Sequence, residues 1–440
     1  MRFTPPQLAA RLEQFPAVRR YWVAYSGGCD SHVLLHALVA LRSRLVGVTL
    51  CALHVNHELH PQASAWSAHC QAVCDALEVP LTQISVDARG VKGESPEAAA
   101  RAARYRAFAG ILEKDDGLLL AHHRDDQAET LLLQLLRGGG PRGLAGMPQW
   151  RKFAAGWLGR PLLAFSRQSL CDYARAEGLQ WIDDPSNFDT EFDRNYLRQT
   201  ILPMLRQRWP SVGATLARAA GHQAEAAALL TQVAERDWQR CRGESRDTLR
   251  ITPFMRLLKA ERQNLLRYWI NDINGLQVPD SRRLTRIQTE LIPAAADAQP
   301  SIRWPGGEVR RYAGQLYLLR AAPNASSGPL VWDLKQTLPL HNGQQLLMKR
   351  KTGQGLKASL SGAPNLTIRF RQGGERCRPA GRGHRHRLKK LMQEWQVPPW
   401  QRDSVPLLYV GEEIAAVVGY CVCEPYQAEA DEEGVVLFTD

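Results

Sequence analysis

A loop of small residues, with the sequence SGGCDS, lies between an apolar run and a helical pattern near the start of the chain. Its members are Ser26, Gly27, Gly28, Cys29, Asp30 and Ser31. A triphosphate needs converging backbone N–H donors, small side chains and the positive end of a helix dipole, and this loop offers all three. Asp30 adds a hard oxygen ligand suited to Mg²⁺. The sequence contains no GxxxxGK[ST] Walker loop, so it predicts a nucleotide site of another kind; a glycine turn without a ligand is the alternative.

A second polar motif, His122–Thr130 (HHRDDQAET), also follows an apolar run and enters a helical pattern. In a helix, Asp125 and Asp126 lie four and three residues before Glu129, so their carboxylates are expected to share a face. Such a group suits Mg²⁺ ligation, recognition of a cationic substrate or acceptance of a proton from an amine. A solvated acidic helix start, favoured by the helix dipole, is the alternative.

Basic residues form three further groups. Arg101 and Arg104 lie on an alanine-rich helical pattern, where they are expected either to contact phosphate or a base or to be solvated. Arg194 and Arg198 lie four residues apart and are expected on one helix face, placed to meet a nucleic-acid backbone. Residues 367–402 contain ten Lys or Arg against two Glu, which predicts a grip on a phosphate chain, with a solvated basic loop as the alternative.

Alternating strand and helix patterns are expected to position these motifs up to about residue 215. The predicted strands are Tyr21–Tyr25, Val46–Val55, Leu81–Val86 and Leu118–Ala121. The predicted helices between them are Ser31–Arg42, Ala63–Leu77 and Pro96–Leu112. This alternation predicts an α/β domain with a doubly wound parallel, Rossmann-like sheet, whose ligands lie at the carboxyl ends of the strands. Both polar motifs follow such ends.

The pattern changes twice further along the chain. Ala217–Arg240 and Glu261–Ile273 predict helices, and a Pro-Gly-Gly turn at Pro305 predicts a β-hairpin. A linker rich in Pro, Ser and Gly then precedes short alternating strands. We therefore predict domains at 1–215, 216–325 and 330–440, the second mainly helical and the third a small α+β domain.

Composition sets the class of protein. The formal net charge of +12 over 440 residues favours an acidic partner such as nucleic acid, although a basic surface that serves only solubility is the alternative. No apolar run approaches the roughly 18 residues that span a bilayer, and the N-terminus lacks a signal-peptide core. The nine cysteines include no CxxC pair and suggest no disulfide framework. A soluble, reduced, cytoplasmic protein is expected.

The SGGxDS loop resembles the PP-loop of the ATP-pyrophosphatase family, and HHxDDQAET closely resembles the tRNA(Ile)-lysidine synthetases within it. Similar stretches are Trp181–Asn187 (WIDDPSN), Arg194–Arg198 (RNYLR), Ile201–Pro203, Gly374–Pro379 (GERCRP) and Leu388–Leu391 (LKKL). The resemblance is strong over roughly the first 205 residues and resumes in the last region, whereas the middle matches only in helical character.

The resemblance implies a two-step reaction that uses ATP and Mg²⁺. AMP is first transferred to the ring carbonyl oxygen of the wobble cytidine in the minor isoleucine tRNA (anticodon CAU), and pyrophosphate leaves. The ε-amine of free lysine then attacks the ring carbon and expels AMP, giving lysidine, which pairs with A instead of G. Decoding thereby switches from AUG to AUA.

These residue patterns, taken together with the resemblance, give the expected residue roles. The loop Ser26–Ser31 binds ATP, with Asp30, Asp126 and Glu129 catalytic and Asp30 holding the metal. Free lysine is bound by Asp125, Asp126 and Glu129. The tRNA is bound by Arg104, Arg194, Arg198, Arg376, Arg378, Lys389 and Lys390. In these terms 1–215 is the adenylating domain, while 216–325 and 330–440 contact tRNA.

Three other functions share some of these features. A tRNA thiolase has the same loop, but Cys70/Cys74 and Cys421/Cys423 lack the CxxC spacing of a sulfur relay. A small-molecule adenylating ligase needs neither a basic terminal segment nor a three-acid pocket. A non-catalytic RNA-binding protein is disfavoured because both polar motifs are intact.

Overall fold

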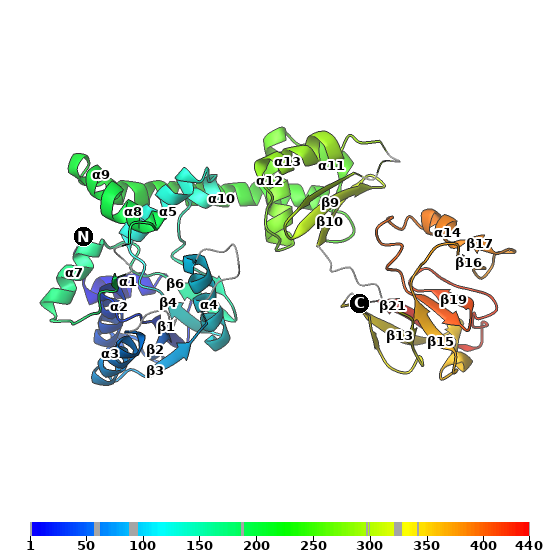
Figure 1. The fold of residues 1–440 in the computed structure, drawn as a ribbon, viewed down its shortest axis with the longest axis horizontal. Helices are drawn as coiled ribbons and strands as arrows, with labels where there is room; N and C mark the ends of the chain where they lie inside the picture. The colour runs from blue at the N-terminus through cyan, green and yellow to red at the C-terminus, as the bar shows by residue number, and fades with distance from the viewer. Residues whose placement is uncertain are drawn as a thin grey trace. The chain divides into compact units, whose positions relative to one another are not determined.

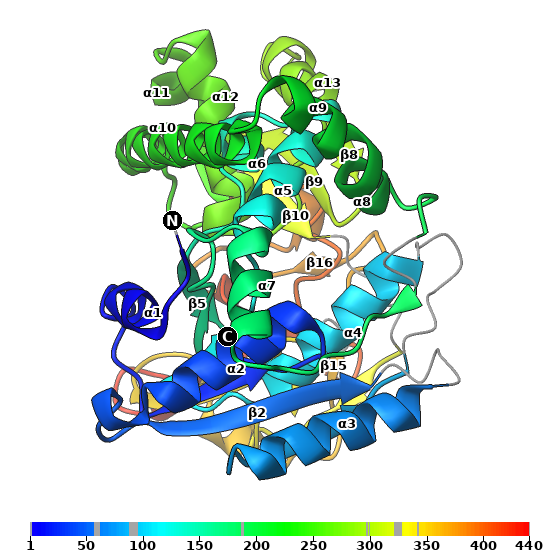
Figure 2. The same cartoon turned by 90° about the vertical axis from the view of Figure 1, so that its left-hand side faces the viewer.

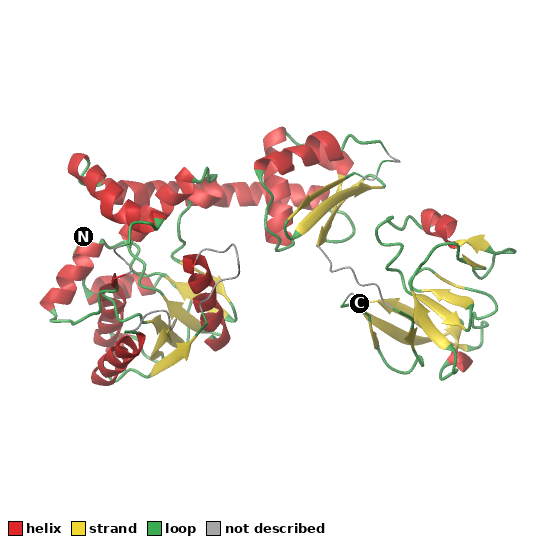
Figure 3. Ribbon diagram, in the orientation of Figure 1, coloured by secondary structure: helices red, strands yellow, loops and turns green. Residues whose placement is uncertain are grey.

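The structure is a computed structural model that describes residues 2–56, 62–87, 96–185, 189–295, 298, 300–320, 328–340 and 343–439. The chain forms two compact units, Met1–Leu230 and Thr231–Asp440, and each is described by itself. Figure 1 colours the elements along the chain, and Figure 3 separates helices from strands. The three-domain division is finer than these units and stays a prediction.

A six-stranded sheet with the order β3-β2-β1-β4-β6-β5 forms the centre of the first unit. Its strands are β1 (Arg20–Ala24), β2 (Thr49–Asn56), β3 (Leu81–Ser85), β4 (Asp116–Leu119), β5 (Trp150–Phe153) and β6 (Gly156–Gly159). Only the edge pair of β5 and β6 is antiparallel; every other neighbouring pair in this sheet is parallel. The predicted doubly wound parallel sheet is confirmed, and the first four strands lie close to their predicted bounds.

Helices cover both faces of this sheet, as Figure 2 shows for α2 and α4. The helices of the unit are α1 (Pro5–Leu12), α2 (Cys29–Ala40), α3 (Ala63–Ala76), α4 (Pro96–Ile111), α5 (Arg124–Leu136), α6 (Pro141–Leu144), α7 (Arg167–Ala176), α8 (Asp193–Tyr196) and α9 (Leu202–Arg208). Alternate residues of β1 enter different cores: Val23 packs in the cluster of α1, α2, α3 and α7, and Trp22 packs with α4. This alternation follows from the two-residue period of a strand.

Two features of this sheet differ from the sequence-based expectation. The predicted strand Val46–Val55 begins only at Thr49, because Gly47 has a φ of 76° and turns the chain before the strand. Strands β5 and β6 were not predicted. They are four residues each, and their Trp-, Lys- and Gly-containing sequences lack a clear two-residue alternation.

The thirty-residue helix α10 (Val212–Cys241) contains the predicted helix Ala217–Arg240. Helices α11 (Ile251–Met255), α12 (Lys259–Tyr268) and α13 (Ser281–Arg286) follow it, and α12 continues as a π-helical turn over Trp269–Ile273. They pack with a four-stranded sheet whose strands, in the order β7-β10-β9-β8, are β7 (Thr248–Arg250), β10 (Gln315–Arg320), β9 (Gly307–Tyr312) and β8 (Ser301–Trp304). The predicted Pro-Gly-Gly hairpin is confirmed as β8 and β9.

The C-terminal region is rich in short strands, as predicted. One sheet has the order β11-β15-β18-β19-β20, a second has the order β12-β13-β21-β14, and they share one core. The strands of the first are β11 (Leu330–Val331), β15 (Leu366–Arg369), β18 (Leu407–Val410), β19 (Glu413–Val417) and β20 (Cys421–Val422). Those of the second are β12 (Leu338–Pro339), β13 (Gln345–Thr352), β21 (Glu433–Thr439) and β14 (Leu356–Lys357). A small pair, β16 (Arg376–Cys377) and β17 (His386–Arg387), precedes α14 (Leu388–Glu394).

Among the helices that the structure describes, none has the length and apolar character required to cross a bilayer.

Candidate active site

The SGGCDS loop connects β1 to α2 and is held in shape by its own two serines. The Ser26 N–H donates to Ser31 Oγ at 3.2 Å, the two hydroxyl oxygens lie 3.1 Å apart, and Ser31 Oγ donates to the Gly28 carbonyl at 2.9 Å. Gly28 precedes the first turn of α2, and no side chain caps that turn. The positive end of the α2 dipole is therefore presented without a capping carboxylate or hydroxyl, as an anion site requires.

Gly27 is required by the geometry of the loop. Its φ is 82°, and a Cβ atom would lie 2.9 Å from Ile182 Cδ1 and 3.0 Å from Cys70 Sγ. The Ile182 N–H also donates to the Gly27 carbonyl at 2.9 Å, so the 181–184 segment is attached directly to the loop. Ser186 and Asn187, which belong to the same sequence motif, lie outside the described residues.

Asp30 lies in the first turn of α2 and faces the second polar motif. Its Oδ2 atom is 3.5 Å from Nε2 of the buried His123. Its Oδ1 atom is buried and has no hydrogen-bond partner among the described residues. A buried carboxylate oxygen without a partner is costly, and an Mg²⁺ ion would satisfy it.

The HHRDDQAET motif starts helix α5 through a reciprocal cap. His123 is the N-cap: its Nδ1 atom accepts from the Asp126 N–H at 3.3 Å, and Asp126 Oδ2 accepts from the His123 N–H at 2.9 Å. This capping box fixes both residues at the end of β4, next to β1. Because β1 leads into the SGGCDS loop, neighbouring strands place both motifs at one edge of the sheet.

Asp126 and Glu129 share one face of α5, as predicted, and both bind two arginines. Glu129 accepts from Arg194 Nε at 2.7 Å and from Arg198 Nε at 2.6 Å. Asp126 Oδ1 accepts from Arg194 at 3.0 Å and from Arg198 at 2.9 Å. Two carboxylates and two guanidinium groups thus form a cluster, called the acid–arginine cluster below. Arg194 and Arg198 share a helix face, as predicted, but that face is directed at the two acids.

Asp125 points away from this cluster. Its carboxylate accepts from the Arg167 N–H at 2.8 Å, at the start of α7, and pairs with Arg206 of α9. Two of the three predicted lysine-binding acids are therefore together, and the third ties α5 to α7 and α9.

A cavity of about 890 Å³ lies between the loop, the ends of the strands and α4. Its walls include Ser26, Gly28, Asp30, Asp126 and Arg198. Arg101 and Arg104 of α4 also line it, as do Asp183 and the β2 end His54–Asn56. Glu129 is 1% exposed and does not line the cavity. The volume lies within the range of small-molecule sites, which is about 300–1,000 Å³.

Charge and burial act in opposite directions on the ionisable groups of this site. Burial would raise the pKa of Asp126, but His123 and the two arginines outweigh it and hold that pKa well below its usual range. Burial lowers the pKa of His122 to about 3, so its ring is neutral near pH 7. Arg160 Nε donates to His122 Nδ1 at 3.2 Å, which leaves the proton of the neutral ring on Nε2.

The predicted basic residues of the C-terminal region lie in the second unit. Arg376 is on β16, Arg378 pairs with Glu424, and Lys389 and Lys390 are exposed on α14. None of them lines the cavity.

Several cavity residues were not predicted from the sequence. His54 and Asn56 are at the carboxyl end of β2, the same position as the two predicted motifs, so the strand-end rule applied to every strand identifies them. The contact of His123 with Asp30 had no such signal, because it depends on how two neighbouring strands are paired.

Three family models match the chain. Residues 5–205 match a PP-loop domain, residues 249–317 match the TilS substrate binding domain, and residues 366–438 match the TilS substrate C-terminal domain.

Two related proteins are similar to this chain over most of its length. A tRNA(Ile)-lysidine synthase of Coxiella burnetii is 45% identical over 434 residues, which cover 98% of this chain and 96% of the relative. One of Methylococcus capsulatus is 44% identical over 401 residues, or 91% of each chain. Among solved structures, a U34-tRNA thiolase from Methanococcus maripaludis matches with a TM-score of 0.43 and 15% identity, covering 50% of this chain and 78% of its own.

Proposed function

Because this chain belongs to the tRNA(Ile)-lysidine synthase family and is an ATP-dependent ligase that forms lysidine, we propose how its cavity divides the reaction. The observation that carries the proposal is that one cavity joins the SGGCDS loop to Asp126 and Arg198. A tRNA thiolase is not favoured by these relatives.

The first half-reaction is assigned to the loop side of the cavity. The uncapped start of α2 and the small loop residues hold the phosphates of ATP. The carbonyl oxygen of the wobble cytidine attacks the α-phosphorus, the bond to the bridging oxygen breaks, and pyrophosphate leaves. A carbonyl oxygen is a poor leaving group, whereas AMP is a good one, so this transfer prepares the ring carbon for an amine.

Asp30 is assigned to Mg²⁺. Its buried, unpartnered Oδ1 atom fits a hard cation, and His123 on the other oxygen fixes the carboxylate. When bound, Mg²⁺ neutralises phosphate charge. The chain itself orients Asp30 through the first turn of α2 and through the cap of α5.

The second half-reaction is assigned to the acid–arginine cluster. Asp126 and Glu129 already hold two cationic side chains, so their charge and spacing suit a cation. Asp126 lines the cavity, and its lowered pKa makes it a weak base but a persistent anion. We therefore assign Asp126 to holding the cationic lysine and Glu129 to positioning Arg198 beside it. Asp125 is assigned a structural role, because it ties the start of α5 to α7 and α9.

The tRNA is assigned to basic residues of both units. Arg101, Arg104 and Arg198 line the cavity and are placed to contact the cytidine or its phosphates. Arg376, Arg378, Lys389 and Lys390 are proposed to bind the tRNA backbone away from the anticodon, and residues 216–325 are also proposed to contact the tRNA. The reaction is placed in the cytoplasm, where tRNA, ATP and lysine are present.

A pyrophosphate and AMP release assay tests this function. Purified protein is mixed with ATP, Mg²⁺ and an unmodified tRNA(Ile) transcript, with and without lysine. We expect pyrophosphate release to require the tRNA, and AMP release to require lysine as well. Pyrophosphate release without tRNA, or a product that forms only with a sulfur donor, would contradict the proposal.

A further inference from the structure

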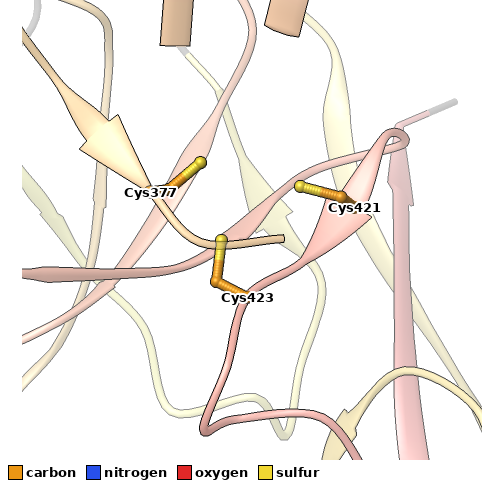
Figure 4. A group of neighbouring side chains, drawn as sticks. All are labelled: Cys377, Cys421 and Cys423. Carbon is orange, nitrogen blue, oxygen red and sulfur yellow. The ribbon is translucent and has the colours of Figure 1, made fainter. Parts of the chain in front are cut away.

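Three cysteines of the C-terminal region direct their sulfur atoms at one point, as Figure 4 shows. The Sγ atoms of Cys377, Cys421 and Cys423 all lie within 4.8 Å of one another. Cys377 and Cys423 are buried, with exposed fractions of 3% and 1%, and Cys421 is half-buried. This cluster lies in the second unit, outside the cavity of the active site.

The backbone fixes this arrangement. Cys421 and Cys423 are two residues apart at strand β20, so the two-residue period places both side chains on one face. The chain after β16 pairs with the chain after β20: Ala380 N–H donates to the Val422 carbonyl at 3.0 Å, and Glu424 N–H to the Arg378 carbonyl at 2.9 Å. Cys377 is thereby held opposite the other two thiols.

The spacing fits a tetrahedral metal ion. With Zn–S bonds of about 2.3 Å, the edges of a tetrahedron are about 3.8 Å, so sulfur atoms within 4.8 Å of one another need to move by about 1 Å or less. A disulfide would use two of these thiols and leave the third; all three are free. Three thiolates with one nitrogen ligand are a common set for structural Zn²⁺, whereas iron–sulfur clusters generally take four cysteines.

The neighbouring strand offers a nitrogen donor, His386, which lies outside the group of three sulfur atoms within 4.8 Å of one another. His386 of β17 is directly opposite Cys377 of β16 in the antiparallel register. Directly opposed residues project from the same side of a strand pair, so the half-buried imidazole lies on the sulfur side. We propose that Cys377, Cys421 and Cys423 bind one Zn²⁺ as thiolates and that His386 completes the tetrahedron.

The position of the cluster indicates what the metal does. Strands β16 and β17 have two residues each, and a pair this short is marginal without further support. The turn between them carries Arg378, Arg382 and Arg385, and α14 starts immediately after β17. Zn²⁺ therefore clips the basic segment 376–390 to β20. Metal binding is independent of the proposed function, but the consequence for tRNA binding rests on it.

Metal analysis of the full-length protein tests the site. The protein is expressed with added Zn²⁺, dialysed and measured by elemental mass spectrometry, and Co²⁺ is then substituted for Zn²⁺. We expect one Zn²⁺ per chain and, with Co²⁺, the absorption of a tetrahedral thiolate complex. Cys421→Ser, at the half-buried position, is expected to weaken the metal affinity at least about tenfold. Cys241→Ser, a buried thiol on α10, is the matched control and should keep the metal.

Four results would overturn the inference or part of it. A wild-type protein that takes up no Zn²⁺ and gives no thiolate absorption with Co²⁺, or one with a disulfide among the three cysteines after purification in reductant, would refute the site. An unchanged metal affinity in His386→Ala would refute the fourth ligand. If Zn²⁺ is bound but its removal by a chelator leaves tRNA affinity unchanged, the clip has no role in tRNA binding, and the site itself stands.

Discussion

The Nε2 atom of His123 lies 3.5 Å from Oδ2 of Asp30, so the residue that caps α5 also contacts the nucleotide loop at α2. Three nearby carboxylates, those of Asp126, Asp30 and Asp125, outweigh the effect of burial and raise the pKa of His123. One side chain thus connects the two motifs that the proposal assigns to successive half-reactions.

His123→Asn is expected to separate these two contacts. Asparagine is a good N-cap but is too short to reach Asp30, so α5 should keep its start while Asp30 loses its neighbour. Hydrogen bonds to charged groups contribute about 1.5–3 kcal/mol, so the KM for ATP should rise about tenfold or more. Steady-state kinetics measure this, and thermal melting confirms the fold. A wild-type KM in a folded variant would show that the contact is not used.

Asp30→Ala is expected to abolish ATP-dependent pyrophosphate release and to leave tRNA affinity largely intact. The reason is that the variant removes the proposed Mg²⁺ ligand without changing any cavity arginine. Asp30→Asn should show activity only at raised Mg²⁺. Asp172→Asn, whose side chain is 55% exposed on α7, is the matched control. Normal pyrophosphate release by Asp30→Ala would place the nucleotide elsewhere.

Glu129→Gln is expected to affect the second half-reaction more than the first. The variant keeps the shape of the side chain but removes one charge from the acid–arginine cluster, so Arg198 should lose its position beside Asp126. We expect the KM for lysine to rise at least about tenfold and adenylated tRNA to accumulate, because about 1.4 kcal/mol is a tenfold change. Radiolabelled ATP traps the intermediate.

Two controls accompany the Glu129 experiment. Breaking a buried ion pair costs about 3–5 kcal/mol, so thermal melting must show that the variant is folded at the assay temperature. Glu177→Gln, at the exposed end of α7, should behave as wild type. If no adenylated tRNA forms, the acids serve the metal instead of lysine.

Replacing Arg378, Lys389 and Lys390 together with alanine is expected to weaken tRNA binding. If each contacts one phosphate, the slope of log affinity against log salt should fall by about 0.7–0.9 per charge. Turnover at saturating tRNA should change much less. The exposed triple Lys335, Lys349 and Lys351 to alanine removes the same charge from the same unit and is the control. Equal salt slopes for both triples, or an equal loss of turnover on an isolated anticodon stem-loop, would leave the basic segment without this role.

His122 is expected to make the fold acid-sensitive. Its pKa is about 3 in the folded chain and 6.5 ordinarily, so between those values the unfolded chain binds one more proton. The unfolding free energy should therefore fall as pH drops from 6.5 towards 3, by up to about 1.4 kcal/mol per pH unit, with no effect above 6.5. His122→Gln should reduce this slope, measured as the thermal midpoint at several pH values. His222→Gln, exposed on α10, should not.

Most of the site geometry was predictable from strand–helix alternation, because parallel strands deliver their carboxyl ends to one edge. That rule predicts that Asp30 and Asp126 lie close together. It did not give the pairing of Arg194 with Glu129, since the connection after α7 is long and carries no periodic pattern that fixes where α8 docks. It also did not separate Asp125 from its neighbours. Helix spacing places Asp125, Asp126 and Glu129 near one face of α5. The Asp125 carboxylate instead binds the Arg167 N–H and Arg206, so it lies away from the other two acids.

The cysteine cluster escaped sequence reasoning for a different reason. A search for CxxC spacing assumes a turn that wraps around the ion, whereas Cys421 and Cys423 use alternate positions of a strand. Their third partner, Cys377, becomes visible only when the pairing of the segments after β16 and β20 is known.

The tight contact at Gly27 also bears on the entropy of nucleotide binding. A Cβ at this residue would lie 2.9 Å from Ile182 Cδ1 and 3.0 Å from Cys70 Sγ, on segments far apart in the sequence, and a hydrogen bond from the Ile182 N–H holds its carbonyl. The loop is therefore preorganised: its backbone holds the phosphate-binding shape in the free protein. Little conformational freedom is left to lose when ATP arrives, so more of the contact energy remains available as affinity.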